Sequence, residues 1–177
     1  MVTMSEKIEV LIDEESLNKR IQEVADKINK DYEGKTIHLI CVLKGGVMFM
    51  CELAKRLSVP VTFDFMSVSS YGAGTSSSGV VKIVKDLDES IEGKEVLIVE
   101  DIVDSGRTLA YLVDMLKSRG PQSVKICSLL DKPSRREVDV EFDYTCFEVP
   151  NIYIVGFGLD HDQKYRNLPY IGGLKFE

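Results

Sequence analysis

The apolar residues of this chain follow two different periods, and the two alternate along the sequence. Residues 16–29 carry apolar side chains at helical spacing, whereas residues 36–43 form a short apolar run typical of a buried strand. A second helical stretch at residues 47–57 and a second strand at residues 59–68 follow. Two strands separated by a helix of this length predict a parallel pair with a right-handed crossover.

The same alternation continues beyond the middle of the chain, although residues 131–151 are mixed in charge and show no long period. Apolar patterns predict strands at residues 80–84, 96–99, 123–130 and 152–157, and a helix with the stripe Leu109, Leu112, Val113 and Leu116. Alternating strands and helices predict an α/β fold with an open, mostly parallel twisted sheet flanked by helices. Ligands of such a sheet gather at the carboxyl ends of its strands.

Length and composition narrow the class of protein. The chain has 177 residues, of which 44% are hydrophobic, so we expect a single domain over residues 1–177. A net charge of −7 and a pI near 5.0 argue against general affinity for nucleic acid or an anionic membrane, since both need clustered positive charge. No apolar run approaches the roughly 20 residues that span a bilayer, and no signal peptide is recognisable. We therefore expect a cytoplasmic protein.

The cysteines and histidines do not indicate a structural metal site. The four cysteines lack a C-x-x-C spacing, and Cys41 and Cys127 lie in apolar strand patterns. They are more typical of small core residues than of a zinc site or a disulfide framework. His38 alternates with apolar neighbours in a predicted strand, which favours a packed structural residue over a metal ligand.

The residues most typical of a ligand-binding site lie in the stretch E-V-L-I-V-E-D-I-V-D-S-G-R-T, residues 95–108. Glu100 and Asp101 fall where the strand is expected to end, and residues 104–108 then lead into the helix. Backbone N–H groups, hydroxyls and the positive end of a helix dipole make such a loop a phosphate cradle. Two carboxylates beside a phosphate would repel it, so we expect them to bind sugar hydroxyls or Mg²⁺. A receiver domain also has an acidic pair after a strand, but near its amino end and without the D-S-G-R-T continuation.

Two other loops are ambiguous when considered alone. Lys44, Gly45 and Gly46 join a strand to a helix, where a glycine pair is common for packing reasons. Residues 69–79, S-S-Y-G-A-G-T-S-S-S-G, cannot bury a core and form either a flexible connector or a catalytic lid. The large side chain of Tyr71 favours the lid.

The 95–108 stretch closely resembles the signature of type I phosphoribosyltransferases, in which two acids precede a D-[ST]-G-x-T loop that binds 5-phosphoribosyl-1-pyrophosphate (PRPP). Matching segments in the same order extend over about residues 36–171, and the later ones resemble the 6-oxopurine members, the hypoxanthine-guanine phosphoribosyltransferases. This resemblance implies the type I fold, with a small hood formed by terminal segments. It also implies a homodimer or homotetramer.

The resemblance assigns a role to each loop. Asp104 would be the general base or proton relay near purine N7, although the residue type also fits a helix N-cap. The Lys44 loop would bind pyrophosphate, and a non-proline cis peptide is frequent there. Ser70 and Tyr71 would lie at the tip of the lid. The residues implied to bind PRPP and its metal are Glu100, Asp101, Asp104, Ser105, Gly106, Arg107 and Thr108, with Lys44, Gly45 and Arg166 on the pyrophosphate.

The carboxyl-terminal third would bind the base. Lys132, in L-L-D-K, would donate to the 6-oxo group, which disfavours adenine because its 6-amino group is itself a donor. Tyr153 would stack on the purine, Ile154 would meet its edge through the backbone, and Asp160 would be a further Mg²⁺ ligand near the base. Without the resemblance, Tyr153 and Ile154 fit a core strand, and Lys132 and Arg166 fit solvated surface charges.

The reaction implied is Mg²⁺-dependent transfer of the phosphoribosyl group from PRPP to N9 of hypoxanthine or guanine, giving IMP or GMP and pyrophosphate. The metal would be a partner of the substrate, with Glu100, Asp101 and Asp160 as its protein ligands. Two alternatives stay open. One is a xanthine-preferring transferase, and the other is a PRPP-sensing regulator of the same fold that binds nucleic acid.

Overall fold

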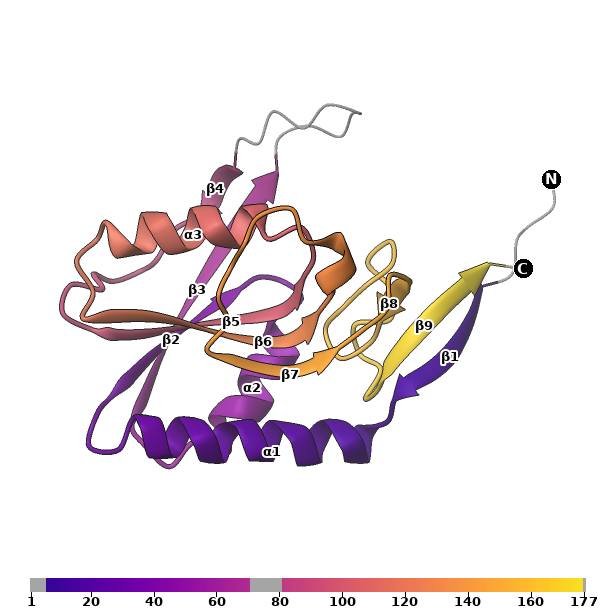
Figure 1. Cartoon of the computed structure of the whole chain (residues 1–177), viewed down its shortest axis with the longest axis horizontal. Helices are drawn as coiled ribbons and strands as arrows, with labels where there is room; N and C mark the ends of the chain where they lie inside the picture. The colour runs from indigo at the N-terminus through magenta and orange to yellow at the C-terminus, as the bar shows by residue number, and fades with distance from the viewer. Residues whose placement is uncertain (1–5, 71–80, 177) are drawn as a thin grey trace.

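The structure is a computed structural model that describes residues 6–70 and 81–176. Its strands form a six-stranded sheet and a separate three-stranded sheet, with helices packed on the larger one (Figure 1). The elements are β1 (Glu6–Ile12), α1 (Glu14–Asp31), β2 (Ile37–Val42), α2 (Val47–Ala54), β3 (Val61–Ser70), β4 (Val81–Lys85), β5 (Glu95–Val103), α3 (Arg107–Lys117), β6 (Ser123–Asp131), η1 (Pro133–Arg135), β7 (Tyr144–Glu148), β8 (Tyr153–Val155) and β9 (Ile171–Phe176).

The larger sheet has the strand order β4-β3-β2-β5-β6-β7. Strands β3, β2, β5, β6 and β7 pair in parallel, and only the edge strand β4 is antiparallel to its neighbour. The prediction of an open, mostly parallel sheet is therefore confirmed, as is the parallel pairing of the first two predicted strands. The carboxyl ends of β2, β5 and β6 consequently lie along one edge, where the predicted site loops begin.

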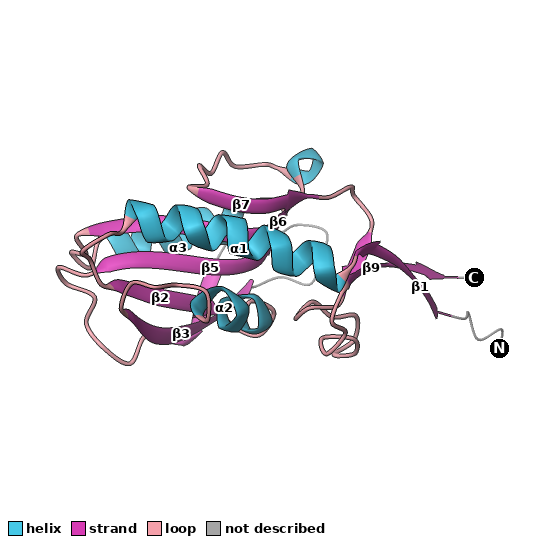
Figure 2. Cartoon of the chain, turned by 90° about the horizontal axis from the view of Figure 1, so that it is seen from below, coloured by secondary structure: helices cyan, strands magenta, loops and turns pink. Residues whose placement is uncertain are grey.

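Helices cover both faces of this sheet because the strands are apolar on both sides. Helices α1 and α2 lie on one face and α3 on the opposite face (Figures 1 and 2). Helix α1 begins after Asp13, whose carboxylate accepts a hydrogen bond from the N–H of Ser16 at 2.8 Å, as an N-cap does. Its buried stripe is Leu17, Ile21, Val24, Ala25 and Ile28.

The three-stranded sheet forms the hood that the resemblance implied, with the order β1-β9-β8. Strand β1 pairs antiparallel with β9, so that Glu6 lies opposite Phe176, and Tyr153 of β8 lies opposite Leu174. Figure 1 shows this small sheet beside the carboxyl ends of β6 and β7. The hood therefore brings both ends of the described chain to the edge of the sheet that carries the site.

The central strand is longer than its apolar run predicted. We expected it to end at the acids, but β5 continues through Glu100 and Asp101 to Val103. Pairing with β6 explains the extension, because Ile102 and Val103 lie in register with Leu130 and Asp131. The two acids therefore project from a rigid strand and not from a turn.

Other boundaries also differ. The strand predicted at residues 59–68 is β3, which starts after Pro60 and extends through Ser69 and Ser70, two residues expected to belong to the lid loop. The helix predicted at residues 47–57 ends at Ala54. The rest of the predicted lid, including Tyr71, lies outside the described residues. Strands β1, β7 and β9 were not predicted individually.

All four cysteines are free, and Cys41, Cys127 and Cys146 are buried as expected, whereas Cys51 is exposed on α2. His38 is buried and its Nδ1 lies 2.7 Å from the Thr62 hydroxyl, which confirms a structural role. Within residues 6–70 and 81–176, none of the helices has the length and hydropathy needed to cross a membrane.

Candidate active site

The two acids at the carboxyl end of β5 lie in a poorly solvated position. Only 9% of Glu100 is exposed, and burial raises its pKa well above the usual value, with a further contribution from the charge of Asp101. Burial likewise raises the pKa of Asp101 to about 6, partly offset by a hydrogen bond from the N–H of Ile102. In the described part of the chain, neither carboxylate has a lysine or arginine within ion-pair distance.

These acids fit a hard divalent cation. Carboxylate oxygens are the ligands that Mg²⁺ prefers. Glu100 is buried and Asp101 is half-buried, and the positive charge of Arg166 only partly offsets the effect of burial on Asp101, so a cation would stabilise both carboxylates. The described residues do not by themselves bring three or more His, Cys, Asp or Glu side chains together as a metal site. A cation at Glu100 and Asp101 would therefore share its coordination with ligand oxygens and water.

Asp101→Asn should raise the melting temperature of the metal-free protein at pH 8 by ~2–6 °C. A carboxyl whose pKa is raised by folding holds its proton more tightly in the native state, so its ionisation lowers stability as the pH rises above 3.8 towards about 6. Asparagine removes that penalty. Thermal unfolding with a chelator at pH 4 and pH 8 measures the effect, which should vanish at pH 4. An equal or lower melting temperature at pH 8 would contradict it.

The loop after β5 is built as an anion cradle. Gly106 has φ +82°, and a Cβ there would lie 2.7 Å from the carbonyl oxygen of Val138, so the position requires glycine. Gly106 has no side chain to cap α3, and among the described side chains only the Ser105 hydroxyl accepts a hydrogen bond from a first-turn N–H, that of Arg107 at 3.4 Å, so the N–H groups of Thr108 and Leu109 are available to a ligand. A cavity of about 140 Å³ lies here, lined by Glu100, Ile102, Val103, Asp104, Ser105, Gly106, Thr108 and Leu109.

Arg107 contributes to this loop through its backbone. Its guanidinium Nε lies 2.5 Å from the Glu137 carboxylate, on the segment that follows η1, and both side chains are about half exposed. The predicted residues Ser105 and Thr108 line the cavity, whereas the Arg107 side chain is not among its lining residues. The ion pair connects the cradle to the 137–140 segment, which already approaches Gly106.

The loop after β2 packs directly against the acids of β5. The peptide bond between Leu43 and Lys44 is cis. It directly precedes the Lys44–Gly45 peptide bond of the predicted pyrophosphate loop. A Cβ at Gly45 would lie 1.6 Å from Oδ2 of Asp101, so the backbone and the carboxylate are in close contact. A Cβ at Gly158 would lie 2.1 Å from the Gly45 carbonyl oxygen. Three segments that are distant in sequence therefore meet at Gly45.

Lys44, Asp160 and Arg166 come together through a residue that the sequence analysis missed. The amide oxygen of Gln163 accepts hydrogen bonds from Lys44 Nζ at 3.2 Å and from Arg166 at 3.3 Å. Arg166 forms an ion pair with Asp160 at 2.9 Å and donates to the Gly158 carbonyl at 2.7 Å. The available signal was the position of Gln163 between two predicted site residues.

The segment that carries Asp160 and Arg166 has an unusual backbone. All non-glycine residues of the described chain with positive φ lie in it, namely Phe157, Asp162, Gln163 and Tyr165. Such conformations are unfavourable for residues with a Cβ and persist where the surroundings impose them, which is frequent at functional sites. The strain therefore agrees with a role for this segment in binding.

A second cavity, of about 370 Å³, lies beside the phosphate cradle and is lined by Asp104, Lys132, Arg135, Asn151, Ile152 and Tyr153. Lys132 Nζ donates to the Ile152 carbonyl at 2.8 Å, and burial lowers the pKa of this amine. Asp104 forms an ion pair with Arg135 at 3.1 Å. Tyr153 is 65% exposed as a residue, which is compatible with stacking of its ring on a ligand.

Arg135, Asn151 and Ile152 were not predicted. Arg135 belongs to the K-P-S-R-R run of η1, and a basic cluster directly after Lys132 was the only signal for it. Ile154 is the middle residue of β8 and is buried in the core, and it is not among the lining residues of the cavity. A contact through its backbone, as the resemblance implied, stays a prediction, and so does the lid role of Ser70 and Tyr71.

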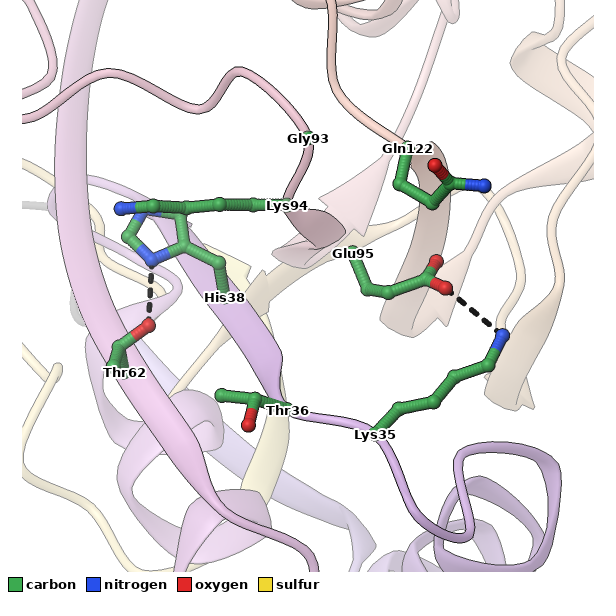
Figure 3. Close-up of a pocket in the computed structure, with 8 residues that line it drawn as sticks. All are labelled: Lys35, Thr36, His38, Thr62, Gly93, Lys94, Glu95 and Gln122. Carbon is green, nitrogen blue, oxygen red and sulfur yellow. Dashed lines mark hydrogen bonds and ion pairs between the residues drawn. The ribbon is translucent and has the colours of Figure 1, made fainter.

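Another cavity, of about 440 Å³, lies at the opposite edge of the sheet, at the amino ends of β2, β3 and β5 (Figure 3). Its charged groups are already paired with one another or with neighbours. Lys35 and Glu95 form an ion pair, drawn as a dashed line in Figure 3, with their charged atoms 2.9 Å apart. Lys94 forms an ion pair with Glu89 at 3.1 Å. None of the predicted site residues lines it. We therefore place the candidate active site at the carboxyl edge.

The chain is similar in sequence and in structure to known proteins. Residues 10–162 match the family model described as a phosphoribosyl transferase domain. A hypoxanthine-guanine phosphoribosyltransferase of Streptococcus thermophilus is 56% identical over 168 residues, which cover 95% of this chain and 93% of that protein. The crystal structure of a Staphylococcus aureus hypoxanthine phosphoribosyltransferase superposes with a TM-score of 0.91 and 48% identity, over 94% of this chain and 91% of that one. The crystal structure of a Bacillus anthracis hypoxanthine-guanine phosphoribosyltransferase superposes with a TM-score of 0.91 and 46% identity, over 94% of this chain and 99% of that one.

Proposed function

Because the chain belongs to the phosphoribosyltransferase family, we propose that it transfers the phosphoribosyl group of PRPP to N9 of a 6-oxopurine, hypoxanthine or guanine, in purine salvage. The products are IMP or GMP and pyrophosphate. The same activity is named for the Streptococcus thermophilus relative.

The observation that carries the proposal is the position of Asp104. This residue lines both the phosphate cradle and the neighbouring cavity that contains Lys132 and Tyr153. The two cavities have the chemistry required by the two substrates, since one offers helix N–H groups to a phosphate and the other offers an amine and an aromatic ring to a base. A carboxylate at their boundary lies where a base would join the sugar.

In the proposed reaction the N9–C1′ bond forms as the bond from C1′ to pyrophosphate breaks. The purine loses one proton, and the Asp104 carboxylate, placed near N7 of the base, accepts it. Lys132 donates to the 6-oxo group, while Lys44 and Arg166 bind the leaving pyrophosphate. Glu100, Asp101 and Asp160 would hold Mg²⁺, which would supply positive charge to stabilise the leaving pyrophosphate. The protein thus contributes orientation and electrostatic stabilisation.

The proposal is tested by a product assay with purified protein and PRPP, in which hypoxanthine, guanine, xanthine and adenine are offered separately. IMP or GMP should form with Mg²⁺ and not with a chelator. XMP as the main product would establish the xanthine-preferring alternative. No nucleotide from any base would contradict the transferase proposal and favour the PRPP-sensing regulator, which a nucleic-acid binding measurement would then test.

Lys132→Gln should raise the KM for hypoxanthine roughly tenfold or more, while the KM for PRPP stays within about threefold. The substitution removes a charge-assisted hydrogen bond to the 6-oxo group but keeps a side chain of similar length. Steady-state kinetics with each substrate varied separately measure both values. Lys19→Gln, at an exposed position of α1, is the matched control. An unchanged KM for hypoxanthine would exclude the role given to Lys132.

The cellular setting follows from the same proposal. Its partners are the small molecules PRPP and a purine base, with neither nucleic acid nor membrane required. We propose a cytoplasmic enzyme that assembles as a homodimer or homotetramer from single-domain chains. Sedimentation of the full chain tests the assembly, and a monomer at micromolar concentration would contradict it.

A further inference from the structure

Three aromatic rings of the carboxyl-terminal part of the chain pack against one another, and one of them, Tyr153, lines the cavity of about 370 Å³ proposed to bind the purine, the purine cavity. Tyr153 begins β8, His161 follows Asp160, and Phe176 ends β9. The centroids of Tyr153 and His161 lie 5.9 Å apart with the rings inclined at 75°. Tyr153 and Phe176 lie 5.9 Å apart at 86°, and His161 and Phe176 lie 5.3 Å apart at 63°. Each ring therefore contacts the other two at a steep angle.

These contacts restrict a side chain that would otherwise be free to rotate. Tyr153 is 65% exposed and stands on a three-residue strand, so its surroundings offer few packing atoms. Nearly perpendicular ring pairs are attractive because the positive edge of one ring meets the negative face of the other. Rotation of Tyr153 about its Cα–Cβ bond would break both of its contacts at once. The ring is therefore held in one orientation before any ligand arrives.

The two supporting rings are themselves attached to the first described strand. His161 Nε2 lies 3.9 Å from a carboxylate oxygen of Glu6, and the Tyr165 hydroxyl donates a hydrogen bond to the same carboxylate. Glu6 lies opposite Phe176 in the β1–β9 pairing. The aromatic cluster thus belongs to the hood, and the pairing of β1 with β9 keeps His161 and Phe176 in place.

We infer that His161 and Phe176 are positioning residues that orient the Tyr153 ring for stacking on the purine. The inference rests on the proposed function, since it assigns a use to the purine cavity. An aromatic platform with a fixed orientation binds a flat base without losing the rotational freedom of its own side chain. The three rings then contribute to the affinity for the base and not to the affinity for PRPP, whose proposed contacts lie on β5, α3, the Lys44 loop and Arg166.

The test compares His161→Ala and Phe176→Leu with the wild-type enzyme, with KM for hypoxanthine, KM for PRPP and kcat measured separately. Each variant should raise the KM for hypoxanthine roughly three- to tenfold and leave the other two constants within about twofold. His161→Phe should restore a KM near the wild-type value because it restores a ring. Tyr111→Leu, which removes an exposed aromatic ring on α3, is the matched control.

The pattern of constants separates positioning from structural damage. Collapse of the hood would also disturb Asp160 and Arg166 in the same segment, so a parallel rise in the KM for PRPP would overturn the inference. An unchanged KM for hypoxanthine in both variants, together with a raised KM in Tyr153→Ala, would overturn it and leave the proposed function intact. An unchanged KM in Tyr153→Ala would instead refute the purine role of Tyr153 and with it the inference.

Discussion

Asp104→Asn is expected to lower kcat by roughly 10²- to 10³-fold, while the KM for PRPP changes by less than about threefold. The substitution keeps the shape of the side chain and an oxygen that can accept a hydrogen bond from Arg135. It removes the carboxylate that takes the purine proton. Asp104 lines both the phosphate cradle and the purine cavity, and no other described carboxylate lines both. No other described side chain is therefore placed to replace it.

Steady-state and single-turnover kinetics at saturating PRPP measure this loss. Asp114→Asn, at an exposed position of α3, is the matched control and should behave as wild type. If Asp104→Asn retained a kcat near the wild-type value, proton transfer to Asp104 would be excluded. The residue would then be limited to orienting Arg135 and the start of α3.

Gly45→Ala is expected to reduce kcat/KM for PRPP at least 100-fold, through a mechanism that requires no loss of a functional group. The added methyl would lie 1.6 Å from Oδ2 and 2.7 Å from Cγ of Asp101, so the loop or the carboxylate must move. Movement of either separates the proposed pyrophosphate loop from the proposed metal ligands. Overpacking of this kind also lowers stability by about 1–3 kcal/mol.

The appropriate comparison is Gly34→Asn. Gly34 has φ +76°, no described atom lies within 4 Å of the position that a Cβ would occupy there, and asparagine tolerates that conformation. This control should retain both activity and melting temperature. Kinetics with PRPP varied, together with thermal unfolding, measure the effect. A Gly45→Ala enzyme with normal kcat/KM for PRPP would show that the contact between the loop and Asp101 is not required.

The central part of the site could be predicted because it is local in sequence. The apolar run of β5, the acids, the D-S-G-R-T loop and the stripe of α3 follow one another within a short stretch, so a strand, a phosphate loop and a helix were expected in that order. The open parallel sheet could also be predicted, since buried parallel strands are apolar throughout and the helices between them have a clear stripe.

The remaining parts depend on contacts between distant residues. Glu100 and Asp101 looked like a turn, and only their register with β6 keeps them in the strand. Gln163 belongs to the site because it contacts Lys44, and Arg135 because it contacts Asp104. In each pair the two residues lie far apart in sequence. Neither β1 nor β9 has the continuous apolar run of a buried strand. Strand β1 is mostly exposed, and β9 contains two adjacent glycines although its first four residues are buried, so pairing contributes more than sequence pattern to both.

The pairing of β1 with β9 also sets the order in which the protein can mature. A ribosome delivers the whole larger sheet, with its phosphate cradle, before it delivers residues 171–176. Among the described strands, β1 pairs only with β9, so it stays unpaired until β9 emerges. The larger sheet and its phosphate cradle are therefore able to fold before β9 emerges, whereas the hood beside the proposed base site is completed only when β9 pairs with β1.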